Sequence, residues 1–175
     1  LERLYAYWRS QEDYAQNPSY FINDYADYIE QCKVLNYDLN DTAIKTPREF
    51  RQMHSNISVA YKAHKSELLN KAIKRVYNTL HSVLEWSDGN LSVVMPKTQD
   101  AIIREGKNQS HCVGTYCERV AKGSCVILFI RKNTAKRKAY YTMEIRPDMA
   151  KFSMVQCRGL RNADTTEDVK VFLKK

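Results

Sequence analysis

The chain has 175 residues, of which 43% are hydrophobic and 11% aromatic, so it can bury one substantial core. Its net charge is +8 at pH 7, and its longest apolar run, residues 125–130, is far too short to cross a bilayer. These features argue against a disordered chain and against a membrane-spanning one, and we expect no membrane partner. The chain begins at a leucine without a basic and apolar leader, which favours a fragment of a cytoplasmic protein.

The first half of the chain is predicted to be helical. Residues 17–19, Asn-Pro-Ser, can begin a helix in which apolar residues recur every three or four positions. The expected buried stripe of this helix contains Tyr20, Ile22, Tyr25, Ile29 and Cys32.

A second, longer helix is predicted after residue 46. Residues 46–49, Thr-Pro-Arg-Glu, form a capping box with proline at the first helical position, and no glycine or proline follows before Gly89. The expected buried stripe contains Phe50, Met53, Ile57, Tyr61, His64, Leu68, Ala72, Val76 and Leu80. We expect this stripe to be a packing face.

Beyond the turn signal at residues 87–90 the pattern changes to that of strands and shorter helices. The expected strands are 91–95, 125–132, 139–146 and 151–158, and the expected helices are 97–108, 114–121 and 165–174. The last two strands should form an antiparallel pair joined through Pro147-Asp148. The predicted fold class is α+β: a helical region, residues 1–87, lies with or beside a small, mainly antiparallel sheet flanked by helices in residues 88–175.

The positive charge is concentrated in the second half. Residues 1–90 hold 11 Lys and Arg against 12 Asp and Glu, a net charge of −1, whereas residues 91–175 hold 17 against 8, a net charge of +9. Because a polyanion suits such a surface, we expect nucleic acid, RNA or DNA, to bind this half. A generic surface with positive loops is the alternative.

Strand alternation predicts a polar face on the last two strands, because side chains switch sides at every residue. The residues that would share it are Tyr140, Thr142 and Glu144 in one strand and Met154, Gln156 and Arg158 in the next. If the apolar faces join one core, Thr142, Glu144, Gln156 and Arg158 line a common polar surface. An ordinary solvent-exposed face, with a weak pair between Glu144 and Arg158, is the alternative interpretation.

Residues 105–162 gather the side chains that do chemistry or hold anions. The candidate catalytic residues are His111, Glu144, Arg131 and Arg158, and the candidate substrate-binding residues are Tyr116, Tyr140, Thr142, Gln156, Asn162 and Arg161. A histidine, a glutamate and arginines are the components of a metal-independent ribonuclease. Glu144 would take a proton from an attacking hydroxyl, His111 would protonate the leaving oxygen, and the arginines would stabilise the phosphate. No paired acidic motif is visible, and we expect no metal and no cofactor.

Other interpretations of these residues stay open. The five cysteines lack a C-x-x-C pair, which favours free thiols in a reducing compartment, and a zinc site of His111, Cys112 and Cys117 would have an unfamiliar spacing. Cys112 would need a turn to face His111 as an activated nucleophile. The polar residues could equally form a buried hydrogen-bonded network, with His111 and Asn162 as loop staples.

Several short motifs of the second half follow one another in a specific order. They are Pro96-Lys97, Glu105-Gly106, His-Cys-Val-Gly-Thr-Tyr at 111–116, Lys122-Gly123, Ile130-Arg131, Tyr-Thr-Met-Glu at 141–144 and Gln-Cys-Arg-Gly at 156–159, followed by Asn162. Through these motifs residues 85–174 resemble the PcfJ-like family of proteins from conjugative plasmids and phages, with Cys117 in place of a more familiar small residue. The resemblance implies a mobile-genetic-element setting but no agreed reaction.

Two hypotheses on function follow. In the first, the basic half binds nucleic acid and cleaves a phosphodiester without a metal. In the second, the chain is a non-catalytic adaptor in a plasmid-transfer or phage assembly, which binds nucleic acid by its basic half and a protein by its helical half.

Overall fold

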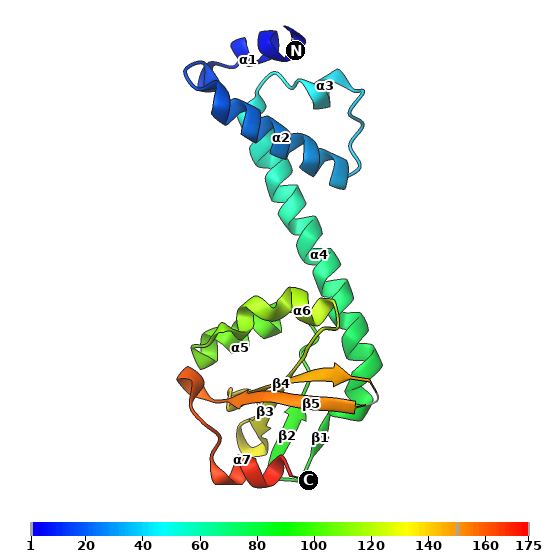
Figure 1. Ribbon diagram of the computed structural model, residues 1–175, viewed down its shortest axis with the longest axis vertical. Helices are drawn as coiled ribbons and strands as arrows, with labels where there is room; N and C mark the ends of the chain where they lie inside the picture. The colour runs from blue at the N-terminus through cyan, green and yellow to red at the C-terminus, as the bar shows by residue number, and fades with distance from the viewer. Residues whose placement is uncertain (1, 150, 175) are drawn as a thin grey trace. The chain divides into compact units, whose positions relative to one another are not determined.

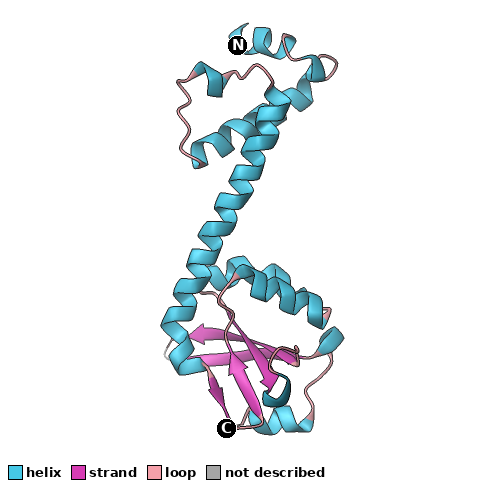
Figure 2. Ribbon diagram, turned by 180° about the vertical axis from the view of Figure 1, so that it is seen from behind, coloured by secondary structure: helices cyan, strands magenta, loops and turns pink. Residues whose placement is uncertain are grey.

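The computed structural model describes residues 2–149 and 151–174. The chain divides into two compact units, an N-terminal unit, Leu1–Ser66, and a C-terminal unit, Glu67–Lys175. Helix α4, Phe50–Leu84, contributes residues to each unit. The C-terminal unit combines helices with an antiparallel sheet (Figure 2), so the predicted α+β fold class is confirmed.

The N-terminal unit is helical and built around an aromatic core. Its elements are α1, Glu2–Arg9, the 3₁₀ helix η1, Glu12–Tyr14, α2, Pro18–Val34, α3, Thr42–Lys45, and the start of α4 (Figure 1). The buried core residues are Tyr14, Phe21, Tyr28, Cys32, Phe50 and Ile57. The rings of Phe21 and Phe50 meet edge to face with centroids 5.4 Å apart, which fixes α2 against α4.

Helix α2 begins where the sequence predicts, but the expected buried stripe was wrong in part. Tyr20 and Ile22 are 65% and 58% exposed, whereas their neighbour Phe21 is buried. The buried stripe runs from Phe21 through Tyr28, two helical turns further on, because this side of α2 faces Phe50.

Helix α4 begins at Phe50, three residues later than the capping box predicts. The Phe50 N–H donates to Gln11 Oε1 over 3.1 Å, and Gln11 is itself buried. Residues 42–45 already form α3, so the capping-box residues 46–49 link two helices. A side chain 39 residues away in the sequence therefore caps α4 in place of the local motif.

The predicted stripe along α4 is buried only in part. Phe50 and Ile57 belong to the core of the N-terminal unit, whereas Leu68 is 51% exposed. Further along, Ile73 rather than the neighbouring Ala72 is buried in a core of the C-terminal unit. Because α4 serves separate cores, its buried positions do not form one continuous stripe.

The sheet of the C-terminal unit has five antiparallel strands within the described residues, in the order of the chain. They are β1, Trp86–Ser87, β2, Leu91–Val94, β3, Val126–Lys132, β4, Tyr141–Asp148, and β5, Lys151–Arg158. Strand β1 was not predicted, because two residues are too few to show an alternating pattern. Strand β3 lies at the centre and β5 at an edge.

Helices pack on both faces of the sheet. One face contacts α7, Glu167–Phe172, and the end of α4. The other contacts α5, Gln99–Gln109, the 3₁₀ helix η2, Cys112–Tyr116, and α6, Cys117–Ala121. On β3, Leu128 packs on the face covered by α7 and the end of α4, and Ile127 packs on the face covered by α5, η2 and α6, as the alternation of a strand requires.

The turn between β4 and β5 lies later than predicted. Pro147 and Asp148 continue β4 and pair with Phe152 and Lys151. The backbone leaves the strand at Met149, which has a left-handed φ of 48°. The expectation that Pro147-Asp148 makes the connection was therefore wrong.

Candidate functional site

Two pairs of polar side chains lie side by side across β4 and β5. Thr142 is opposite Arg158, and Glu144 is opposite Gln156, as the alternation predicts. The layer of α5, η2 and α6 packs on this face, and Thr142 and Glu144 are only 6% and 3% exposed. The alternative of an ordinary solvent-exposed face was therefore wrong for the two β4 residues.

A register shift interrupts the pairing directly after these polar pairs. Glu144 pairs with Gln156, but the next residue, Ile145, pairs with Met154, so Val155 is the extra residue of a bulge. The bulge places Met154 on the face of Ile145 rather than on that of Gln156. The predicted alignment of Met154 with Gln156 was wrong because simple alternation assumes an uninterrupted strand.

A pocket of about 40 Å³ opens on this polar face. The predicted site residues that line it are His111, Tyr116, Thr142, Glu144, Gln156, Arg158 and Asn162. Cys112, Val113 and Ile127 complete the lining. The pocket has space for about three water molecules or for one small polar group.

His111 enters the pocket from the loop that follows α5. The His111 N–H donates to the Gly106 carbonyl over 3.1 Å, which holds the loop against the helix. A Cβ at Gly106 would lie 2.7 Å from the Gly114 nitrogen, so the close approach of η2 to α5 requires a glycine there. The Nε2 of His111 is buried and has no hydrogen-bond partner among the described residues.

Glu144 is the buried carboxylate of the pocket. Its Oε1 accepts from Arg119 Nη2 at 2.7 Å and its Oε2 from Gln156 Nε2 at 2.9 Å, with Arg146 Nη2 3.5 Å from Oε1. Burial by itself would raise the pKa of Glu144. The hydrogen bonds from Gln156 and Arg119 and the two positive charges outweigh it and lower the pKa below its usual value, so the carboxylate is ionised at neutral pH.

Tyr116 and Arg119 form one wall beside this carboxylate. The Arg119 guanidinium lies over the Tyr116 ring, 4.5 Å from its centroid, while it donates to Glu144. Burial, followed by interaction with Cys112, raises the pKa of Tyr116. The Cys112 thiol is exposed and 3.9 Å from the Tyr116 hydroxyl.

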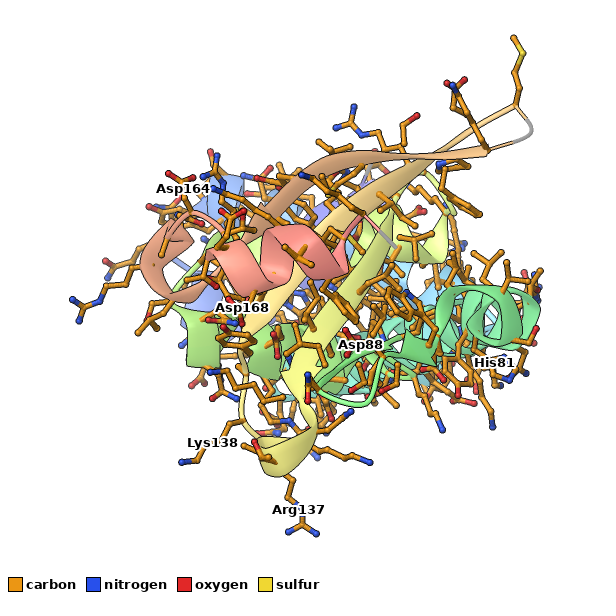
Figure 3. All side chains as sticks on the ribbon, turned by 90° about the horizontal axis from the view of Figure 1, so that it is seen from below. His81, Asp88, Arg137, Lys138, Asp164 and Asp168 are labelled. Carbon is orange, nitrogen blue, oxygen red and sulfur yellow. The ribbon has the colours of Figure 1, made fainter. Side chains whose placement is uncertain are left out.

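The opposite end of the pocket is formed by the end of β5 and the 3₁₀ helix η4, Leu160–Asn162. Arg158 forms an ion pair with Asp164, whose side chain is 89% exposed. Figure 3 shows Asp164 at the periphery of the unit. Asn162 lines the pocket from a left-handed backbone conformation, with φ of 62°. The weak pair between Glu144 and Arg158, part of the alternative interpretation, was wrong, because each residue has another partner.

Arg131 is on the same face of the sheet but lies outside the pocket lining. Its Nη1 donates to Glu105 Oε1 over 3.0 Å, and its Nη2 is also bonded to this carboxylate. The Thr142 hydroxyl donates to the same Oε1 over 2.8 Å. All three residues are buried, so they form a hydrogen-bonded network between α5, β3 and β4.

Two further residues predicted to bind substrate, Tyr140 and Arg161, are also outside the pocket lining. The Tyr140 hydroxyl donates to Asp168 over 2.9 Å, and the Lys132 ammonium lies 4.3 Å from the centre of the Tyr140 ring. Arg161 is exposed on η4, with a left-handed φ of 53°.

Three residues that hold the site in place were missed as site residues from the sequence. Arg119 and Asp164 are the partners of Glu144 and Arg158, and Glu105 anchors Arg131. Arg119 and Asp164 carry no local pattern that would reveal a tertiary partner. For Glu105, the signal was its place in the Glu105-Gly106 motif, one turn before the His111 loop.

The polar cluster does not form a recognisable metal centre. Within residues 2–149 and 151–174, no group of three or more His, Cys, Asp or Glu side chains is placed to hold a metal ion. His111, Cys112 and Cys117 do not form such a group, and Cys117 is buried in the core on α6.

An exposed basic loop connects β3 and β4. We use this name for Lys132, Lys136, Arg137 and Lys138, all of which are exposed. Figure 3 shows the Arg137 and Lys138 side chains pointing away from the body of the unit. Between Lys132 and Met143 the sequence contains no acidic residue.

The fold and the site define a small α+β unit with a buried carboxylate, a histidine and an arginine around one pocket. A model of the PcfJ-like protein family matches residues 24–173, which includes most of both units. The chain therefore belongs to the PcfJ-like protein family. This match begins well before residue 85, where the motifs quoted above suggested that the resemblance starts.

An uncharacterized protein of Listeria innocua serovar 6a is similar to this chain, with 28% identity over 147 residues. The similarity covers 83% of this chain but only 31% of that protein. No solved structure matches the chain. In the part of the chain that the structure describes, each helix is too short or too polar to cross a lipid bilayer.

Proposed function

We propose that the C-terminal unit binds nucleic acid and that the pocket around His111 cleaves phosphodiester bonds without a metal. The observation that carries this proposal is the presence of His111, Glu144 and Arg158 around a single pocket. These side chains are the acid, the base and the cation that a phosphodiester cleavage requires.

The state of each group suits the role that we assign to it. Glu144 is an ionised carboxylate. Its Oε1 accepts from Arg119 and Arg146, whereas its Oε2 accepts only from Gln156 among the described residues and keeps a second lone pair. It can therefore accept a proton from an attacking hydroxyl. The Nε2 of His111 has no hydrogen-bond partner among the described residues, so we assign to it the role of the donor to the leaving oxygen. Arg158, at 42% side-chain exposure, can exchange Asp164 for a phosphate.

The basic loop supplies the binding surface for the backbone of the nucleic acid. Its four cations belong to the half of the chain that carries a net charge of +9. Lysine and arginine side chains at a surface neutralise phosphates and release counterions, so binding should weaken steeply as salt increases.

The test is incubation of the full chain with labelled RNA and single-stranded DNA, with and without EDTA. His111→Ala and Glu144→Gln should each lower an EDTA-resistant cleavage rate by about 100-fold or more and leave binding intact. The matched controls are His64→Ala on α4 and Glu167→Gln on α7, neither of which lines the pocket. Absence of both binding and cleavage, or cleavage that persists in the pocket variants, would overturn the proposal.

A second candidate function is the non-catalytic adaptor. The observation that favours it is an apolar groove of about 340 Å³ in the N-terminal unit, lined by Leu4, Tyr5, Trp8, Pro18, Phe21 and Ile22. Tyr5 and Ile22 in this groove are 62% and 58% exposed, as expected of a surface that binds a protein. Under this hypothesis the two pocket variants bind nucleic acid normally, no cleavage is detected, and neutralising the basic loop abolishes binding.

A further inference from the structure

The lining of the pocket suits the backbone of a nucleic acid. The pocket, of about 40 Å³, has space for the reacting atoms of one linkage. Its polar lining combines one carboxylate with side chains that can donate hydrogen bonds, among them His111, Arg158 and Asn162. A phosphate oxygen fits such donors, and a hydroxyl group fits the carboxylate.

The source of the nucleophile follows from the strength of the base. The Glu144 carboxylate accepts hydrogen bonds from Gln156, Arg119 and Arg146, and a carboxylate held by these donors is a weak base for activating free water. The described residues also contain no group of metal-binding side chains that would generate hydroxide. A weak base suffices when the nucleophile is already attached beside the reacting atom, where effective molarities reach about 10⁵–10⁸ M.

We infer that the substrate of this pocket is RNA and that its own 2′-hydroxyl is the nucleophile. The inference rests on the proposed function and names its substrate class. Among nucleic acids, the 2′-hydroxyl distinguishes RNA from DNA, and it is adjacent to the phosphate that is cleaved.

The proposed reaction uses three side chains of the pocket and the 2′-hydroxyl of the substrate. Glu144 accepts the proton of the 2′-hydroxyl while O2′ forms a bond to phosphorus. The bond between phosphorus and O5′ breaks, and protonated His111 gives its proton to the leaving O5′. Arg158 stabilises the charge on the phosphate oxygens. The products are a 2′,3′-cyclic phosphate and a 5′-hydroxyl, and exchange of protons with water restores both residues.

The site geometry also assigns a positioning role to Arg119. This side chain holds Glu144 at 2.7 Å and stacks on Tyr116, so it fixes the orientation of the carboxylate without having to contact the substrate. If Arg119 keeps Glu144 ionised, Arg119→Gln should move the acidic limb of the pH–rate profile to higher pH. Arg146→Gln, which removes a more distant cation 3.5 Å from the same oxygen, should move it less.

The experiment compares three strands of one sequence, all RNA, all DNA and fully 2′-O-methylated RNA, with the full chain in EDTA. We expect only the RNA strand to be cut, at least about 100-fold faster than the other two, and mass spectrometry to find 2′,3′-cyclic phosphate ends. His111→Ala should abolish these products.

The outcomes separate this inference from the proposed function. Cleavage of DNA or of methylated RNA at a comparable rate would overturn the RNA inference and leave the nuclease proposal standing. Cleavage of RNA that leaves 3′-hydroxyl ends would do the same, because the 2′-hydroxyl would not be the nucleophile. Cleavage of none of the strands would overturn both.

Discussion

Replacing Arg131 with methionine should destabilise the C-terminal unit by about 3–5 kcal/mol. Glu105 is 3% exposed and accepts two hydrogen bonds from the Arg131 guanidinium, so the variant leaves a buried carboxylate with only the Thr142 hydroxyl as a partner among the described residues. The double variant Arg131→Met with Glu105→Leu removes the charge on both sides. The double variant should recover all but about 1 kcal/mol of the lost stability, and this remainder is the cost of the unpaired Thr142 hydroxyl.

The two tryptophans allow this change to be measured in the C-terminal unit alone. Trp8 belongs to the N-terminal unit, whereas Trp86 stacks on Phe172 in the C-terminal unit with ring centroids 4.3 Å apart. In a Trp8→Phe background, fluorescence of Trp86 therefore reports urea unfolding of that unit. With a slope of about 1.5 kcal/mol/M, the predicted loss lowers the midpoint by about 2–3 M.

Arg137→Met is the matched control, because Arg137 is exposed on the basic loop and its replacement should change stability by less than about 0.5 kcal/mol. The reasoning would be refuted if Arg131→Met left the midpoint unchanged and abolished cleavage of RNA. Arg131 would then act on the substrate, as the sequence analysis suggested, rather than through the network with Glu105.

Three further predictions concern the pocket and its surroundings. Gly106→Ala should lower the free energy of unfolding by about 1–3 kcal/mol, because the added Cβ would meet the Gly114 nitrogen at 2.7 Å. Gly114→Ala should be tolerated, because the atom nearest to its Cβ lies 3.5 Å away. Urea unfolding of the two variants compares them. The pKa of Glu144 is lowered on folding, so its contribution to stability is complete above the usual value of 4.5 and is lost as pH falls through the lower folded-state pKa. Urea midpoints measured between pH 7 and pH 3 should fall less steeply for Glu144→Gln than for the unchanged chain, and equal slopes would contradict this assignment. Changing the four residues of the basic loop to glutamine should weaken the salt dependence of nucleic-acid binding. The slope of log K against log salt concentration should decrease in magnitude by about 3 for single strands, and an unchanged slope would place the binding surface elsewhere.

The alternation of β4 and β5 was enough to predict which polar side chains share a face. Thr142, Glu144 and Arg158 all line the same pocket, because the side-chain period of a strand is fixed by backbone geometry. The same rule failed at Met154, where one extra residue in β5 reverses the faces. A bulge has no signature in a simple alternating pattern, so its position could not be predicted.

The partners of the charged residues could not be predicted for a different reason. Arg131 and Arg158 are both arginines on strands, and their local sequences do not distinguish a buried role from an exposed one. Arg131 is paired with Glu105, 26 residues earlier in the chain, whereas Arg158 is paired with Asp164, which is largely exposed. Such differences arise only when tertiary packing brings a helix onto the sheet.

The buried network explains how a residue outside the pocket can control the chemistry within it. Glu105 lies on α5, one turn before the end of the helix from which the His111 loop departs. Its bonds to Arg131 and Thr142 fix that helix against β3 and β4. The distance between His111 and the carboxylate on β4 therefore depends on the network, because one group is carried by the helix and the other by the strand. Loss of Arg131 should accordingly lower activity through the position of His111, and the double variant that restores stability should restore much of that activity as well.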